Sequence, residues 1–184
     1  SEVYGTAQRV PQDETHPLHA QSPYAATKIA ADQLVLSYIY SHGIDATIIR
    51  PFNTYGPRQS ARAFIPHVIT SLLKGEELNV GNLTPQRDLT FVSDTVAGIM
   101  AGERGAKKVY NLGSGTSYPM WDVLDRIADL LGVKPKIELK YQRPVSSEVW
   151  ALQSDNSLAK RELGWEPTVS LDDGLKQTVE WYKK

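Results

Sequence analysis

The sequence predicts an α/β protein, because segments with a helical pattern alternate with short apolar runs that are typical of buried strands. Residues 23–41 have a helical pattern that ends before Gly43, and residues 46–50 (ATIIR) then form a partly β-branched apolar run. A second amphipathic helix is predicted over residues 62–74, with Gly75 after it. A helix that leads directly into a buried strand is typical of a parallel sheet.

The remaining elements follow from the same patterns. The first 22 residues are polar and rich in Pro, Gln and His, which indicates the end of a strand and then a long surface loop that could cover a substrate. Apolar side chains are spread around more than one face of the helix over 23–41, so one side is expected to face the sheet and the other to be covered by more protein or by a partner subunit. Further elements are strands at 78–80, 89–92 and 109–112, and helices from Ser93 or Asp94 to about 103 and near 121–131, 157–163 and 171–182.

Composition places the chain among ordinary globular proteins, because 184 residues with 41% hydrophobic and 22% charged side chains suffice for one domain with a real core. A formal net charge of −1 argues against a protein that binds polyanions, so nucleic acid is not an expected partner. The absence of cysteine excludes disulfides and thiolate catalysis, and the four scattered histidines do not suggest a metal site. No run of about 18–20 apolar residues occurs, so no membrane span is expected and cytoplasmic residence is the default.

A tyrosine and a lysine one helical turn apart, Tyr24 and Lys28, are the most informative feature of the sequence. Residues i and i+4 lie on one face of a helix with Cβ atoms about 5–6 Å apart, so the Lys28 ammonium can approach the Tyr24 phenol. A cation there favours the phenolate form, which would let Tyr24 act as a general base in the reversible oxidation of an alcohol. Ser22 and Pro23 suit the cap and the first turn of this helix. The same spacing is common in exposed surface pairs, so the surrounding motifs decide between the two interpretations.

The motifs that carry a family resemblance are SEVYG at 1–5, SPYAATK at 22–28, RPFNTYGPR at 50–58 and ELGWEP at 162–167. Over practically its whole length, the chain resembles the extended short-chain dehydrogenases/reductases that act on nucleotide sugars, a group of epimerases, dehydratases and decarboxylases. The resemblance implies the C-terminal portion of a Rossmann-type doubly wound sheet plus a smaller α/β substrate-binding domain. Residues 1–57 would be the remnant of the NAD-binding domain and residues 58–184 the nucleotide-sugar-binding region, with the two interleaved.

The resemblance implies NAD as the cofactor and assigns roles around it. Tyr24 would take the proton from a sugar hydroxyl while hydride leaves the same carbon, and Lys28 would hold the phenolate and the cofactor ribose. Pro51 and Phe52 would line the nicotinamide side of the site. In this family the helix of the catalytic tyrosine typically forms a helix-bundle dimer interface, so a homodimer through residues 24–41 is expected.

The chain is expected to lack the cofactor-binding half of such an enzyme. A dinucleotide site needs an early strand, a Gly-rich turn and a helix whose N-terminus receives the pyrophosphate, and nothing before Tyr24 supplies these elements. The run GSG at 113–115 has no third glycine at the required offset, so it is interpreted as a tight turn. By the family register, a catalytic hydroxyl falls one residue before Ser1. Most of the NAD site would then lie outside this chain, and the 184 residues alone would be inactive.

Glu2 favours one reaction over others. After oxidation to a 4-keto sugar, a carboxylate can remove the proton at C5 so that the C6 hydroxyl leaves as water, which is a 4,6-dehydration. The epimerases of the family generally carry a small residue at this position, and the decarboxylases usually have acidic residues where this chain has AAT at 25–27. The prediction is therefore an NDP-sugar 4,6-dehydratase, with a UDP-sugar 4-epimerase or a non-catalytic nucleotide-sugar-binding module as alternatives. An exposed carboxylate at a strand end is the plainer interpretation of Glu2.

A sugar diphosphate carries two negative charges and requires guanidinium and amide donors. The residues that match the substrate clamp of the family are Asn53 for the sugar or its phosphate, and Arg87 and Arg143 for the diphosphate. Asp88 is expected to be the structural neighbour of Arg87. The match at Arg143 departs from the family, because the usual Gly-Asp after Arg-Pro is replaced by VSSE at 145–148. For each arginine, a surface or core salt bridge is the alternative.

Overall fold

The computed structural model describes residues 1–105, 108–141 and 144–184, and it confirms the α/β architecture that the sequence predicts. The α-helices are α1 (Pro23–His42), α2 (Phe64–Lys74), α3 (Val92–Ala101), α4 (Met120–Leu131), α5 (Ser157–Leu163) and α6 (Leu171–Tyr182). The strands are β1 (Ile48–Pro51), β2 (Asn53–Tyr55), β3 (Leu78–Gly81), β4 (Gln86–Phe91), β5 (Val109–Leu112), β6 (Ser117–Pro119) and β7 (Ile137–Tyr141). Short 3₁₀ helices are η1 (Glu2–Tyr4), η2 (Gly102–Arg104) and η3 (Val145–Ser147).

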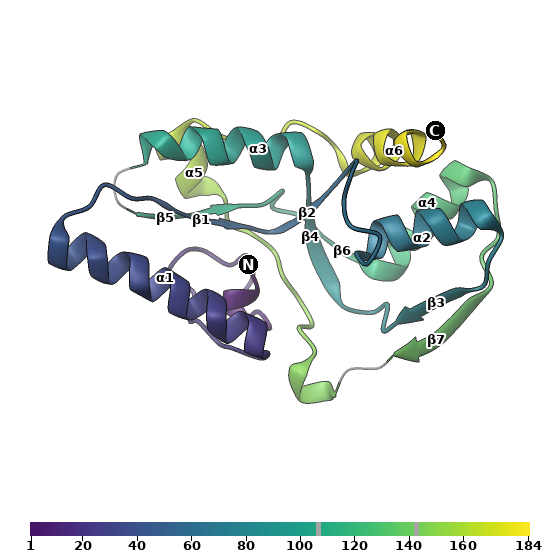
Figure 1. Ribbon diagram of the computed structural model, residues 1–184, viewed down its shortest axis with the longest axis horizontal. Helices are drawn as coiled ribbons and strands as arrows, with labels where there is room; N and C mark the ends of the chain where they lie inside the picture. The colour runs from purple at the N-terminus through teal and green to yellow at the C-terminus, as the bar shows by residue number, and fades with distance from the viewer. Residues whose placement is uncertain (106–107, 142–143) are drawn as a thin grey trace.

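At one end of the molecule, β1 and β5 form a parallel pair with helices on both faces (Figure 1). Ile49 of β1 lies against Gly102 at the end of α3, whereas Arg50 pairs with Asp32 of α1. Because successive residues of a strand point to opposite faces, α1 and α3 cover opposite sides of this sheet. Gly98 lets α3 approach β5 closely, since a Cβ at this position would come within 2.5 Å of the Leu112 side chain.

At the other end, α2, α4 and α6 pack together beside the parallel pair β3 and β7 (Figure 1). Apolar residues at helical spacing on these helices meet the buried residues of β3 and β4 in one core. The most buried of its members are Val68, Ile69, Leu78, Val123, Leu124, Ile127 and Leu175. None of the helices in the described part of the chain is long and apolar enough to cross a membrane.

The sheet β2–β4–β6 joins the two ends. β2 runs parallel to β4, and β6 runs antiparallel to it. Phe52 alone separates β1 from β2, so the chain passes from the first sheet to the middle sheet at the RPFN motif. Asn53, the first residue of β2, therefore lies where the two ends of the molecule meet.

The N-terminal segment differs from the prediction. The expected strand end is the 3₁₀ helix η1, and the loop after it is partly buried rather than wholly on the surface. Tyr4, Gln12 and His16 are at most 2% exposed. Most of their polar groups are hydrogen-bonded: the Tyr4 hydroxyl donates to Asn111 Oδ1 at 2.6 Å, His16 Nε2 accepts from the Gln8 N–H at 3.0 Å, and Gln12 Oε1 accepts from the Gln153 N–H at 3.0 Å, whereas Gln12 Nε2 has no partner among the described residues. Such pairing allows a polar segment to pack inside the protein.

Asp94 does not cap a helix, as was expected for it or Ser93. Helix α3 begins earlier, at Val92, and the Asp94 carboxylate accepts hydrogen bonds from the Thr168 and Val169 N–H groups and the Thr168 hydroxyl at 2.9–3.0 Å. Asp94 thus anchors the segment before α6 to α3. Helix α2 differs in the opposite direction, because it starts at Phe64, two residues later than predicted.

Candidate active site

Helix α1 presents Tyr24 and Lys28 near its N-terminal end. Ser22 caps the helix, because its Oγ accepts a hydrogen bond from the Ala25 N–H at 3.1 Å. The Lys28 ammonium lies 5.5 Å from the centroid of the Tyr24 ring, which is within the range of a cation–π contact. Tyr24 is 58% exposed, so its phenol is accessible from outside this chain.

Tyr24 and Lys28 line a cavity of about 340 Å³ between α1, η1 and β1. Its other lining residues are Ser1, Glu2, Val3, Asp32, Ile49, Arg50, Pro51, Phe52 and Asn53. Phe52 is 2% exposed and packs against Tyr4 with ring centroids 6.2 Å apart, so it forms a fixed apolar wall. Pro51 and Phe52, which were predicted on the nicotinamide side, thus lie beside the Tyr24–Lys28 pair.

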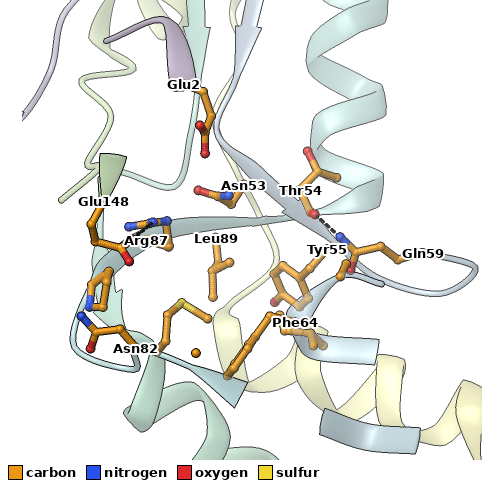
Figure 2. A pocket seen from close by; sticks show the side chains of 15 residues that line it. Glu2, Asn53, Thr54, Tyr55, Gln59, Phe64, Asn82, Arg87, Leu89 and Glu148 are labelled. Atoms are coloured by element: carbon orange, nitrogen blue, oxygen red, sulfur yellow. Dashed lines mark hydrogen bonds and ion pairs between the residues drawn. The ribbon is translucent and has the colours of Figure 1, made fainter. Parts of the chain in front are cut away.

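A second cavity, of about 380 Å³, contains the predicted substrate residues Asn53 and Arg87 (Figure 2). Figure 2 shows Arg87 and Glu148 together at one side and Phe64 towards α2 at the base. The apolar side chains of Phe64, Ile65, Leu89 and Met120 also line the cavity. The cavity therefore offers both polar and apolar groups to a ligand.

Arg87 is held at the wall of the second cavity by a carboxylate other than the one predicted. Its NH1 donates to the Val149 carbonyl at 2.6 Å, and its NH2 lies 3.6 Å from Glu148 Oε1. The expectation that Asp88 would be its neighbour is wrong, because adjacent residues of a strand point to opposite faces. The side chain of Arg87 is 13% exposed, so its charge acts in a partly desolvated site.

Asp88 instead holds the turn at 113–115. The carboxylate is fully buried and accepts hydrogen bonds from the N–H groups of Ser114, Gly115 and Ser154 at 2.7, 3.0 and 2.9 Å. Burial raises the pKa of Asp88 in spite of these donors. Since Asp88 occupies the amides of this turn, they are not available to a phosphate, which agrees with the tight-turn interpretation.

Glu2 and Asn53 line both cavities and so form their junction. The Glu2 carboxylate points towards Asn53 (Figure 2). Asn53 Oδ1 is buried and has no hydrogen-bond partner among the described residues. A buried acceptor without a donor costs roughly 1–3 kcal/mol, so a ligand hydroxyl or N–H at this point would be favoured.

Arg143, the second arginine predicted for the clamp, lies outside the described residues and stays a prediction. Sequence reasoning also missed Gln59 and Glu148, which line the second cavity. Glu148 belongs to the VSSE run that departs from the family pattern, and that departure was a usable signal. Gln59 had none: its Nε2 donates to the Thr54 carbonyl at 2.9 Å, and its Oε1 is buried without a partner in the described chain.

The two cavities together suit an elongated alcohol with a group at one end that the Arg87 guanidinium, which is paired with Glu148, can bind. Arg87 provides a cation at one end, Tyr24 and Lys28 provide a proton-transfer pair at the other, and the Glu2 carboxylate lies between them. Within residues 1–105, 108–141 and 144–184, no group of three or more His, Asp or Glu side chains could hold a metal ion. The chemistry that these side chains can perform themselves is proton transfer next to a bound anion.

A family model decides what this arrangement belongs to: residues 1–178 match the model described as GDP-mannose 4,6 dehydratase. The chain is a member of the GDP-mannose 4,6 dehydratase family. This confirms the predicted resemblance to the nucleotide-sugar dehydratases and epimerases. Among curated relatives, the dTDP-glucose 4,6-dehydratase of Streptomyces griseus is 36% identical to this chain over 187 aligned residues. The alignment covers 100% of this chain and 56% of that protein.

Solved structures of such enzymes share the fold. A double mutant of DesIV, the dTDP-glucose 4,6-dehydratase of Streptomyces venezuelae, was solved with NAD and superposes with a TM-score of 0.94 at 32% identity, over 100% of this chain and 57% of that one. The UDP-glucuronic acid 4-epimerase of Bacillus cereus, in complex with UDP-glucuronic acid and NAD, gives 0.92 at 28% identity, over 100% and 59%. The chain thus spans a little over half the length of these relatives and matches the C-terminal part of their Rossmann-type architecture.

Proposed function

We propose that this chain is the catalytic and substrate-binding portion of an NAD-dependent nucleotide-sugar 4,6-dehydratase, which forms a 4-keto-6-deoxy NDP-sugar. The observation that carries the proposal is the junction of the two cavities at Glu2 and Asn53. A diphosphate next to Arg87 would place its sugar beside Tyr24 and Lys28. Relatives that are dehydratases or epimerases support this class of reaction.

The residues around Tyr24 fit the nicotinamide end of NAD, because Pro51 and Phe52 provide an apolar wall and Lys28 a cation beside it. When bound, NAD supplies the acceptor for the hydride that leaves the sugar. Tyr24 takes the proton of the sugar hydroxyl at its phenolate oxygen, and Lys28 stabilises the negative charge before that transfer.

Glu2 would carry the step after oxidation. Its carboxylate takes the proton from C5 of the 4-keto sugar, a C5–C6 double bond forms, and the C6 hydroxyl leaves as water with that proton. The hydride that NAD would hold then adds to C6, and C5 takes up one proton, equal to the one that Tyr24 removed from the C4 hydroxyl, which gives the 6-deoxy product. Glu2 lines both cavities, which is the place that this role requires.

The diphosphate clamp would consist of Asn53, Arg87 and Arg143. Residues 58–184 would be the nucleotide-sugar-binding region, and residues 1–57 the part that faces the cofactor. The two would interleave, because β5 from the second region pairs with β1 from the first.

Turnover is tested with this chain joined to an NAD-binding half, which we call the complete enzyme. The 184 residues alone are expected to be inactive. The complete enzyme is incubated with UDP-, dTDP- and GDP-hexoses, and the products are analysed by mass spectrometry. Loss of one water from the sugar supports the dehydratase. An isomer of unchanged mass would support the second candidate, a UDP-sugar 4-epimerase, and tight binding without turnover would support a non-catalytic module.

Arg87→Ala should weaken the binding of UDP, dTDP or GDP to this chain about 10- to 100-fold. A charge-assisted hydrogen bond contributes roughly 1.5–3 kcal/mol, and the variant removes its donor. Isothermal titration calorimetry measures the affinities. Arg126→Ala is the control, because Arg126 pairs with Asp122 and Asp172 and lines neither cavity. Equal affinity of the Arg87→Ala and wild-type chains would remove Arg87 from the clamp.

We also propose a homodimer through α1. This helix exposes Leu34, Tyr38 and Tyr40 by 60, 49 and 81%, while Ala25 and Ile39 are its buried residues. A second copy would remove these apolar side chains from water. Leu34→Glu should therefore shift the chain from dimer to monomer in light scattering, whereas Leu73→Glu, at a 42% exposed position on α2, should not. A wild-type chain that stays monomeric at high concentration would contradict the interface.

A further inference from the structure

Arg50 and Asp32 form an ion pair beside Tyr24 and Lys28 that the proposed reaction does not use. Arg50 Nε donates to Asp32 Oδ2 at 2.8 Å, and the two side chains are 6% and 14% exposed. The pair joins β1 to α1, and both residues line the same cavity as Tyr24. A buried ion pair contributes little net stability relative to well-packed apolar residues, so stability alone does not explain it.

Arg50 is fixed from its other side by hydrogen bonds that lead to β5. Its NH1 donates to the Tyr4 hydroxyl at 2.9 Å, and that hydroxyl donates to Asn111 Oδ1 at 2.6 Å. The Asn111 N–H in turn donates to Glu14 Oε1 at 2.8 Å. The guanidinium also lies 5.1 Å from the centroid of the Tyr4 ring. The guanidinium is therefore the fixed partner, and it determines where the Asp32 carboxylate lies.

Asp32 occupies a position from which a carboxylate could capture Lys28. The two residues are four apart on α1, which is a spacing at which opposite charges pair on a helix. In the described part of the chain, however, Lys28 forms no ion pair, and its ammonium faces the Tyr24 ring. Asp32 is paired with Arg50 instead.

We propose that Arg50 is a positioning residue, which holds Asp32 away from Lys28 and so keeps the ammonium available to the Tyr24 phenolate. The inference rests on the proposed function, which assigns proton transfer to Tyr24 and Lys28. Without Arg50, the Asp32 carboxylate would turn to Lys28, and its negative charge would cancel most of the effect of the ammonium on Tyr24.

Two further groups that face the pair are Glu2 and the Ser1 amino group. Burial lowers the pKa of the Ser1 amino group to about 6, so this group is neutral near pH ~10, where tyrosines ionise. Glu2 is unchanged in every variant described below, so its effect on the ionisation of Tyr24 cancels when the variants are compared with one another.

The test measures how strongly Lys28 affects the ionisation of Tyr24 in the 184-residue chain. Tyrosine labelled with ¹³C at Cζ gives an NMR signal for Tyr24, which the Tyr24→Phe variant assigns. Lys28→Met should raise the pH midpoint of this signal in the wild-type background, because it removes the cation beside the phenol. In an Arg50→Gln background, the same substitution should have almost no effect. Adding Asp32→Asn to Arg50→Gln should restore the full effect, since no carboxylate is left to hold the ammonium.

Arg126→Gln provides the matched control, because Arg126 also pairs with aspartates and lies 5.5 Å from the ring centroid of Tyr118. In that background the effect of Lys28→Met should stay complete. A complete effect in the Arg50→Gln background would overturn the inference and leave the proposed function intact. No effect in the wild-type background would overturn the pairing of Tyr24 with Lys28, and with it both proposals.

If circular dichroism shows that the Arg50→Gln chain does not fold, the inference is tested by comparing the effect of Lys28→Met in the Asp32→Asn background with its effect in the wild-type background. The Asp32→Asn substitution keeps an amide oxygen for Arg50 Nε to bind. Lys28→Met should change the pH midpoint of the Tyr24 signal by the same amount with and without Asp32→Asn, because Asp32 does not pair with Lys28 in the wild-type chain. A clearly larger effect in the Asp32→Asn background would show that Asp32 already competes for the ammonium, which overturns the inference.

Discussion

Tyr24→Phe is expected to lower the kcat of the complete enzyme by about 10²- to 10⁴-fold, because it removes the oxygen that takes the proton of the sugar hydroxyl. Nucleotide-sugar binding should persist, since Arg87 and Asn53 are unchanged. The midpoint of thermal unfolding should also persist, because the ring is 58% exposed and its hydroxyl forms no hydrogen bond in the described part of the chain. Steady-state product formation, calorimetry and a thermal melt measure these three quantities.

Tyr40→Phe is the matched control for this variant. Tyr40 lies on the same helix and is 81% exposed, but it does not line the cavity of Tyr24 and Lys28. Normal turnover is expected from it. If the Tyr24→Phe enzyme also turned over at the wild-type rate, Tyr24 would not be the base, and the proposed mechanism would fail.

Glu2→Gln should separate oxidation from dehydration in the complete enzyme. The amide keeps the size of the side chain but cannot take the C5 proton, so release of the 4-keto-6-deoxy product should fall about 100-fold or more. Oxidation of the sugar precedes that step, and the absorbance of reduced cofactor should still appear in a single turnover.

Glu76→Gln controls for the loss of a negative charge, because Glu76 is an exposed residue after α2 and lines neither cavity. It should dehydrate normally. Normal dehydration by Glu2→Gln as well would make Glu2 structural. An epimerised product from both variants would favour the epimerase.

Much of the fold could be predicted because the patterns that mark it are local. The ends of α1, α4 and α6 lie within one residue of the predicted ones, since caps, helical periodicity and glycine stops act within a few positions. β2 and β6 were missed because each has three residues and is a strand only through its pairing with β4. β7 was missed for a related reason, since its pairing with β3 is a contact between distant segments.

The candidate site was predictable to a different degree at each residue. The spacing of Tyr24 and Lys28 is local, so the sequence could place them together. Glu2, Asn53 and Arg87 came from the family resemblance, and the structure places them around two adjoining cavities. The pairing of Glu148 with Arg87 could not be predicted from local patterns, because the two residues are 61 positions apart in the sequence. They come together only when the chain folds.

By itself, the sequence determined the α/β class, the helix that carries Tyr24 and Lys28, and the motifs of the family. These depend on propensities and on side chains a few positions apart. Only the tertiary structure decided that Glu2 and Asn53 stand between two cavities, that Glu148 rather than Asp88 pairs with Arg87, and that Asp32 pairs with Arg50. The strength of an ion pair depends on separation and desolvation, and both arise when packing brings distant segments together.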